Sequence, residues 1–81
     1  MKQSRHKDWQ KAFGLKIREI RKSKGYTQEK LSYLADIELS TLNRIELGKA
    51  GTSLTNIFSL SEALEIHPQQ LFDFVLPQKG K

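Results

Sequence analysis

The sequence contains no cysteine, which excludes disulfide bonds and metal sites built from thiolates. It also has no apolar run near the roughly 20 residues that a membrane-spanning helix needs. Its basic first residues are not followed by the apolar segment of a secretory signal. We therefore expect a cytoplasmic protein.

Motifs of catalysis and of cofactor binding are missing as well. The chain has no phosphate-binding loop and no dinucleotide-binding fingerprint. Its serines and carboxylates form no triad and no paired-carboxylate pattern, and His6 and His67 are too isolated to suggest a metal pair or a catalytic base. We expect a protein that is not an enzyme and that has no cofactor, no metal and no small-molecule ligand.

What the sequence does have is an excess of positive charge near its start. The chain has 81 residues, enough for one small domain, and a formal net charge of +5. Residues 1–24 carry nine of the basic residues and two of the acidic ones, whereas the remainder is slightly acidic. This imbalance indicates a polyanionic partner such as DNA, RNA or an anionic membrane, although a solvated, lysine-rich helix face would give the same pattern.

The hydrophobic pattern predicts an all-α domain, because no segment shows the sustained two-residue alternation of a strand. Asp8, Thr27 and Ser53 are candidate N-caps, and Gly25 and Gly48 are candidate helix ends. The domain is expected to cover residues 8–76, between a flexible basic tail at 1–7 and a short tail at 77–81. The five predicted helices cover residues 8–24, 28–35, 39–47, 54–64 and 68–76.

Each of the first four predicted helices has an apolar face that we expect to lie in the core. Trp9, the only tryptophan, is expected in the core or at an interface. Asp36 follows the second helix where a left-handed backbone is expected, a conformation that Asp tolerates better than most residues. The other expected core residues are Phe13, Ile17, Ile20, Leu31, Leu34, Ala35, Leu42, Ile45, Leu54, Ile57, Leu60, Ala63 and Leu64.

Residues 28–47 have the spacing of a helix-turn-helix, two short helices joined by a turn of three or four residues. The blocks at 17–32, 40–48 and 53–72 follow one another at the spacing of the XRE family, the phage-repressor and Cro type of helix-turn-helix. The chain resembles this family over about three-quarters of its length. The resemblance implies a five-helix, lambda-repressor-like fold and a DNA-binding function, as in short regulators such as restriction–modification controller proteins.

The resemblance also implies which residues face the DNA bases. In the family, the second helix of the motif lies in the major groove and presents its first residues to base edges. Arg44 could bind guanine O6 and N7, Asn43 could pair with adenine, and Leu39 could contact a thymine methyl group. An alternative for Arg44 is an ion pair with Glu38 or Glu46 along the helix. The implied base contacts are Leu39, Ser40, Asn43 and Arg44, with Thr41 reaching either a base or a phosphate.

Other positions match phosphate-binding and structural residues of the family. Gln28 matches a phosphate contact at the start of the first motif helix, and the loop from 49 to 53 matches a backbone contact through Lys49, Thr52 and Ser53. Arg21 and Glu46 match an ion pair that ties the first predicted helix to the third. Three residues depart from the family pattern: Asp36 replaces a turn glycine, Glu38 replaces a Ser or Thr cap, and Leu47 stands where polar residues are common.

The last predicted helix suggests a dimer. On a helical wheel its apolar residues cover a wider arc than the roughly 100° that a core-facing stripe needs. A two-fold dimer would cover the excess, with Leu71, Phe74, Val75 and Leu76 at its interface. The alternative is that this segment packs back on the first helix, against Trp9 or Phe13.

The function that these patterns favour is a transcription regulator that binds specific double-stranded DNA as a homodimer on a palindromic operator, without a membrane partner. A second interpretation is an antitoxin-like module that binds an unlike protein through its last helix and regulates its own gene. A third is non-specific nucleic-acid binding through the basic first helix, which would show no sequence preference and a steep salt dependence.

Overall fold

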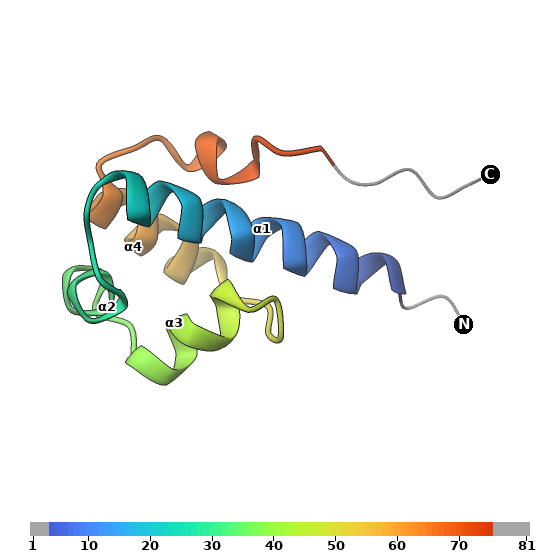
Figure 1. Ribbon diagram of the computed structural model, residues 1–81, viewed down its shortest axis with the longest axis horizontal. Coiled ribbons are helices and arrows are strands. Elements are labelled where there is room, and N and C mark those ends of the chain that lie inside the picture. Colours follow the sequence, from blue (N-terminus) through green and yellow to red (C-terminus); the bar gives the residue numbers. More distant parts are fainter. Residues whose placement is uncertain (1–3, 76–81) are drawn as a thin grey trace.

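The computed structural model describes residues 4–75, and every regular element among them is helical (Figure 1). The elements are α1 (Ser4–Ser23), α2 (Gln28–Ala35), α3 (Leu39–Glu46), α4 (Leu54–Leu64) and the 3-10 helix η1 (Pro68–Phe72). The all-α prediction is confirmed. The predicted count of five α-helices is wrong, because the fifth segment is a single short 3-10 helix. The tail predicted at 77–81 lies outside the described residues.

The long helix α1 forms the spine of the molecule. It packs against α3 on one side and η1 on the other, and α2 packs against both α3 and α4 (Figure 1). Every element except the first half of α1 contributes to a single core, which explains how such short helices are stabilised. The buried apolar residues are Ile17, Leu31, Ala35, Ile37, Leu42, Ile45, Ile57, Leu60, Leu64 and Leu71.

Helix α1 begins earlier than predicted. It starts at Ser4, so residues 4–7 are helical instead of forming a tail, and Asp8 lies within the helix instead of capping it. No proline or glycine stands between Ser4 and Phe13, so nothing in the sequence stops the helix from extending toward the N-terminus. As a result, the first half of α1 projects beyond the other helices (Figure 1).

This projection explains why Trp9 is not in the core, while its predicted place at an interface stays a prediction. Two wrong core predictions share a related cause. Trp9 lies on the projecting part of α1 and is 52% exposed, so it is not a core residue. Leu34 and Leu54, predicted in the core, are 42% and 68% exposed. A three- and four-residue pattern defines a stripe along a helix, but the neighbouring helices cover only part of that stripe.

The predicted caps of α2 and α4 are confirmed. Thr27 Oγ1 accepts a hydrogen bond from Lys30 N at 3.0 Å, and Ser53 Oγ accepts one from Asn56 N at 3.1 Å. Asp36 is left-handed as predicted, with φ of 56°. A second left-handed residue, Glu65 with φ of 59°, ends α4 and was not predicted. Both residues therefore carry a conformational cost that glycine would avoid.

The segment after α4 corrects the predicted dimer interface. His67 caps η1 through Nδ1, which accepts from Gln69 N at 3.0 Å, but the helix stops at Phe72 instead of continuing to 76. Leu71 is completely buried in the core of its own chain, so it cannot be an interface residue. Phe72 stacks on Phe13 with ring centroids 5.2 Å apart, which is the packing against α1 that the sequence left as an alternative. Leu76 lies outside the described residues.

Two glycines allow α1 to approach α3 and the loop that follows it. A Cβ atom on Gly14 would lie 2.2 Å from the carbonyl oxygen of Ile45, and one on Gly48 would lie 2.7 Å from the Cα atom of Lys11. Gly48 also has a φ of +75°, which L side chains rarely adopt. These two contacts fix the position of α1 beside the C-terminal end of α3.

Candidate nucleic-acid interface

Helices α2 and α3 form the predicted helix-turn-helix, joined by the short turn from Asp36 to Glu38. Leu42 and Ile45 of α3 are buried against the core, so the opposite side of the helix faces outward. Glu38 stands at the N-cap of α3 and makes no side-chain capping bond there, which agrees with its departure from the Ser or Thr pattern.

The residues predicted to contact bases lie on the outward side of α3. Leu39, Ser40, Asn43 and Arg44 are exposed, and Thr41 is half-buried at the edge of this face. They occupy the first six positions of the helix, and neighbours spaced by three or four residues lie on the same side. We refer to Leu39, Ser40, Asn43 and Arg44 as the α3 face. It presents an apolar group, a hydroxyl, an amide and a guanidinium to solvent.

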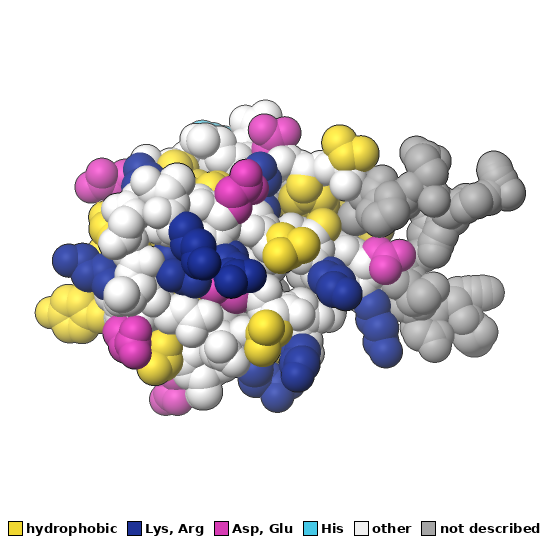
Figure 2. Space-filling view, in the orientation of Figure 1, with side chains coloured by type: hydrophobic (Ala, Val, Ile, Leu, Met, Phe, Trp, Pro, Cys, Tyr) yellow, Lys and Arg dark blue, Asp and Glu magenta, His cyan; other side chains and the backbone are white. Residues whose placement is uncertain are grey.

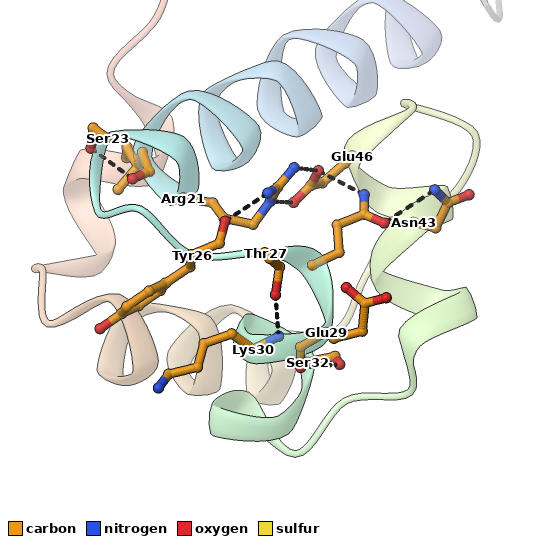
Figure 3. Close-up of polar contacts among 11 residues, drawn as sticks. Arg21, Ser23, Tyr26, Thr27, Glu29, Lys30, Ser32, Asn43 and Glu46 are labelled. Atoms are coloured by element: carbon orange, nitrogen blue, oxygen red, sulfur yellow. Dashed lines mark hydrogen bonds and ion pairs between the residues drawn. The ribbon is translucent and has the colours of Figure 1, made fainter.

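A buried ion pair fixes α3 against α1. Arg21 Nε donates to Glu46 Oε2 at 2.7 Å, and Arg21 Nη2 donates to Glu46 Oε1 at 2.9 Å, with both residues buried (Figure 3). Arg21 Nη1 also donates to the carbonyl oxygen of Tyr26 at 2.9 Å. The predicted ion pair is confirmed, and its two parallel hydrogen bonds set the orientation of both side chains.

The hydrogen bond to Glu46 raises the pKa of Arg21, although burial opposes this shift. Arginine is already protonated at any pH at which proteins fold, so the guanidinium stays charged and the pair persists. The α3 face is therefore held by a contact that does not titrate near neutral pH.

The same carboxylate organises a second contact that the sequence did not predict. Gln28 Nε2 donates to Glu46 Oε1 at 2.9 Å, and Gln28 Oε1 accepts from Asn43 Nδ2 at 3.4 Å (Figure 3). The first residue of α2 thus links the buried ion pair to the exposed α3 face. No feature of the sequence identifies this contact, because hydrophobic periodicity places neither Gln28 nor Asn43.

The alternative role for Arg44, an ion pair within α3, is not supported by the structure. Both oxygens of Glu46 already accept hydrogen bonds, and Glu46 is buried on the other side of the helix. Among the residues that the structure describes, Arg44 makes no ion pair with Glu38 either. The Arg44 guanidinium is left available for an external acceptor.

The predicted phosphate contacts differ in how accessible their polar groups are to a ligand. Gln28 is half-buried beside the α3 face, and Lys49 is exposed in the loop that follows α3. Ser53 is also exposed, and its hydroxyl caps α4 while it can still donate outward. Thr52 is different, because its hydroxyl oxygen is buried and has no hydrogen-bond partner among the described residues. The Thr52 hydroxyl is therefore not presented at this surface, although the residue as a whole is half-buried.

The surface around α1 and α3 is basic. Figure 2 shows Lys and Arg side chains from the centre of the view toward the right-hand end of the described part of the chain, with Asp and Glu mostly at other edges. Arg18 and Lys22 of α1 line a cleft together with Gln28, Asn43 and Leu47.

In residues 4–75 no group of His, Cys, Asp and Glu could hold a metal ion, and no helix is apolar and long enough to span a membrane.

The comparisons with known proteins agree with this architecture. The HTH_3 model, described as helix-turn-helix, matches residues 17–71, from the middle of α1 to the end of the core. The chain belongs to this family. Its members named below are regulators or controllers, which argues against an enzymatic role.

Two relatives are control or controller proteins by name or title. Control protein C.BamHI from Bacillus amyloliquefaciens is 43% identical over 63 residues, which cover 76% of this chain and 78% of the relative. The restriction-modification controller protein C.AhdI from Aeromonas hydrophila is 40% identical in sequence. Its crystal structure matches this fold with a TM-score of 0.77. That similarity covers 78% of this chain and 96% of C.AhdI.

A second structure supports the fold alone. An HTH_3 family transcriptional regulator from Vibrio cholerae has a TM-score of 0.79 at 18% identity. The match covers 83% of this chain but only 38% of that protein.

Proposed function

We propose that this protein is a transcription regulator that binds specific double-stranded DNA as a homodimer on a palindromic operator. The observation that carries the proposal is the exposed α3 face, which is held in place by the buried Arg21–Glu46 pair. Membership of the helix-turn-helix family and similarity to controller proteins support it. The matched relatives favour a regulator over the antitoxin-like module.

In this proposal the α3 face reads base edges in the major groove. Arg44 donates two parallel hydrogen bonds to guanine, and Leu39 contacts a thymine methyl group. Asn43 pairs with adenine, and its bond to Gln28 restricts the amide before DNA arrives. Ser40 contacts a base, and Thr41 contacts a base or a nearby phosphate.

Phosphate contacts would position α3 and supply most of the affinity. Gln28, Lys49 and Ser53 are exposed or half-buried at the two ends of the motif, where they could reach the DNA backbone on either side of the groove. We do not assign the Thr52 hydroxyl to this role, because it is buried.

The dimer would place two α3 faces about one turn of DNA apart, roughly 34 Å. Leu71 is excluded from its interface, and the remaining candidates in the described chain are Phe74 and Val75. Val75 is 90% exposed in the single chain, so a partner subunit could cover it.

The test is the pattern of base preference in an Arg44→Ala variant. The affinity for the preferred duplex should fall by about 1–3 kcal/mol, and the preference should relax at one base pair per half-site. An Arg18→Ala variant is the control, because it removes an equal charge from α1 and should not change any base preference. If Arg44→Ala weakens binding to every sequence equally, Arg44 is not a base contact.

A further inference from the structure

A second basic cleft lies between the first half of α1 and the loop that follows α3. Three residues from α1 and three from the end of α3 line it: Lys7, Gln10, Lys11, Leu47, Gly48 and Lys49. Lys7 was predicted to lie in the basic tail, and neither Gln10 nor Lys11 was assigned a role from the sequence. The cleft exists because α1 begins at Ser4 and extends past the rest of the domain.

The charges in this cleft are all of one sign. Lys7 and Lys11 are one helical turn apart on α1, and Lys49 lies in the loop, so three lysines line one cleft. All three side chains are exposed, and none belongs to an ion pair with another residue of the described chain. No carboxylate lines the cleft. Like charges brought together in this way favour an anion between them.

The two walls of the cleft are held together by backbone contacts. Gly48 touches the backbone of Lys11 so closely that a Cβ atom would lie 2.7 Å from its Cα atom. A Cβ atom on Gly51 would lie 3.4 Å from Gln10 Nε2, in ordinary contact. The spacing between Lys11 and Lys49 is therefore set by the fold rather than by flexible side chains alone.

The position of the cleft relates it to the DNA-binding surface. Leu47 lines both this cleft and the neighbouring one that contains Arg18, Lys22 and Gln28. The two basic clefts thus lie side by side between α1 and the C-terminal end of α3. Figure 2 shows basic side chains continuing in this direction toward the end of the described chain.

We propose that Lys7, Gln10 and Lys11, together with Lys49, bind one further phosphate of the DNA backbone. This inference rests on the proposed function, since it takes duplex DNA as the partner. A phosphate suits the cleft because lysine ammonium groups act as point charges toward anionic oxygens, and the Gln10 amide can donate an additional hydrogen bond. The contact adds affinity and salt dependence but no base preference.

The experiment compares two double variants with equal changes in charge. Lys7→Gln/Lys11→Gln removes the two charges on the α1 side of the cleft. The control Lys24→Gln/Lys30→Gln removes two exposed lysines elsewhere, one in the turn after α1 and one in α2. Binding is measured over a range of KCl concentrations on a duplex selected from random sequence by the wild-type protein. The cleft variant should lower the magnitude of the salt slope by about 0.9 per protomer, and the control should change it much less.

Neutral methylphosphonates, placed one at a time along the duplex, then locate the contact. At one phosphate per half-site the wild type should lose affinity and the cleft variant should not, while base preferences stay the same in both proteins. Equal salt slopes for the two double variants, or identical methylphosphonate profiles, would overturn the proposal. If the wild type prefers no sequence at all, the proposed function fails, but the slopes on an unrelated duplex still decide the role of the cleft.

Discussion

The strongest structural prediction concerns the buried pair of Arg21 and Glu46. The variant Glu46→Leu leaves a buried guanidinium with a single acceptor, the Tyr26 carbonyl, and Arg21→Met leaves a buried carboxylate with only the Gln28 amide as donor. Stranding one member of such a pair costs about 3–5 kcal/mol. A domain of this size has a total stability of only about 4–12 kcal/mol, so each single variant should be close to unfolding at room temperature.

The double variant Arg21→Met/Glu46→Leu should behave differently. It removes both charges and fills the space with apolar groups, a replacement that is often neutral or stabilising. We expect it to be more stable than either single variant, so the coupling between the two changes should be at least about 3 kcal/mol.

Urea unfolding at one fixed protein concentration measures this coupling, since a dimer's stability depends on concentration. With a slope near 1 kcal/mol per molar urea, each single variant should lower the midpoint by about 3–5 M. The pair Lys16–Glu19, 3.4 Å apart with a half-buried lysine and an exposed glutamate, is the control, and Lys16→Met should cost less than about 1 kcal/mol. Additive costs in the Arg21 and Glu46 series, or single costs as small as the control, would refute the reasoning.

The remaining predictions concern other parts of the molecule. Gly14→Ala should destabilise the fold by about 1–3 kcal/mol in urea unfolding despite its better helix propensity, because its Cβ atom would overlap the Ile45 carbonyl oxygen. Glu65→Gly should raise the free energy of unfolding by about 0.5–1 kcal/mol, because it relieves a left-handed backbone. An unchanged free energy of unfolding would show that Glu65 bears no strain. Val75→Asp should shift the mass in analytical ultracentrifugation toward monomer and weaken operator binding; an unchanged mass would remove Val75 from the interface. Because the pKa of Arg21 is raised in the folded protein, its contribution to stability is fully present below the ordinary pKa of arginine and is lost only as the pH rises through the raised value. The destabilisation caused by Arg21→Met should therefore stay constant from about pH 6 to pH 9.

The sequence was most informative where local chemistry decides the structure. Thr27 and Ser53 were predicted as caps, and Asp36 as left-handed, because side-chain oxygens and backbone preferences act within a few residues. The Arg21–Glu46 pair joins residues 25 positions apart, and only the family resemblance pointed to it.

Helix lengths and contacts between helices could not be predicted from the sequence in this way, because they depend on how the helices pack against one another. The apolar residues after Pro68 fitted an α-helix with an excess apolar face, yet burial of Leu71 and stacking of Phe72 on Phe13 hold a short 3-10 turn instead. The early start of α1 was missed because Asp8 is a good cap type, although nothing before it prevents a helix. The bond between Gln28 and Asn43 depends on the crossing of α2 and α3, which no sequence pattern encodes.

The central claim is that the α3 face selects a DNA sequence, and selection from a pool of random duplexes tests it most directly. The enriched duplexes should share a two-fold symmetric sequence whose half-sites are about one helical turn apart. Their complexes should survive an excess of unrelated duplex at both low and moderate salt. A pool that shows no enrichment, with complexes that unrelated duplex removes completely, would contradict the account and leave only salt-dependent, non-specific binding.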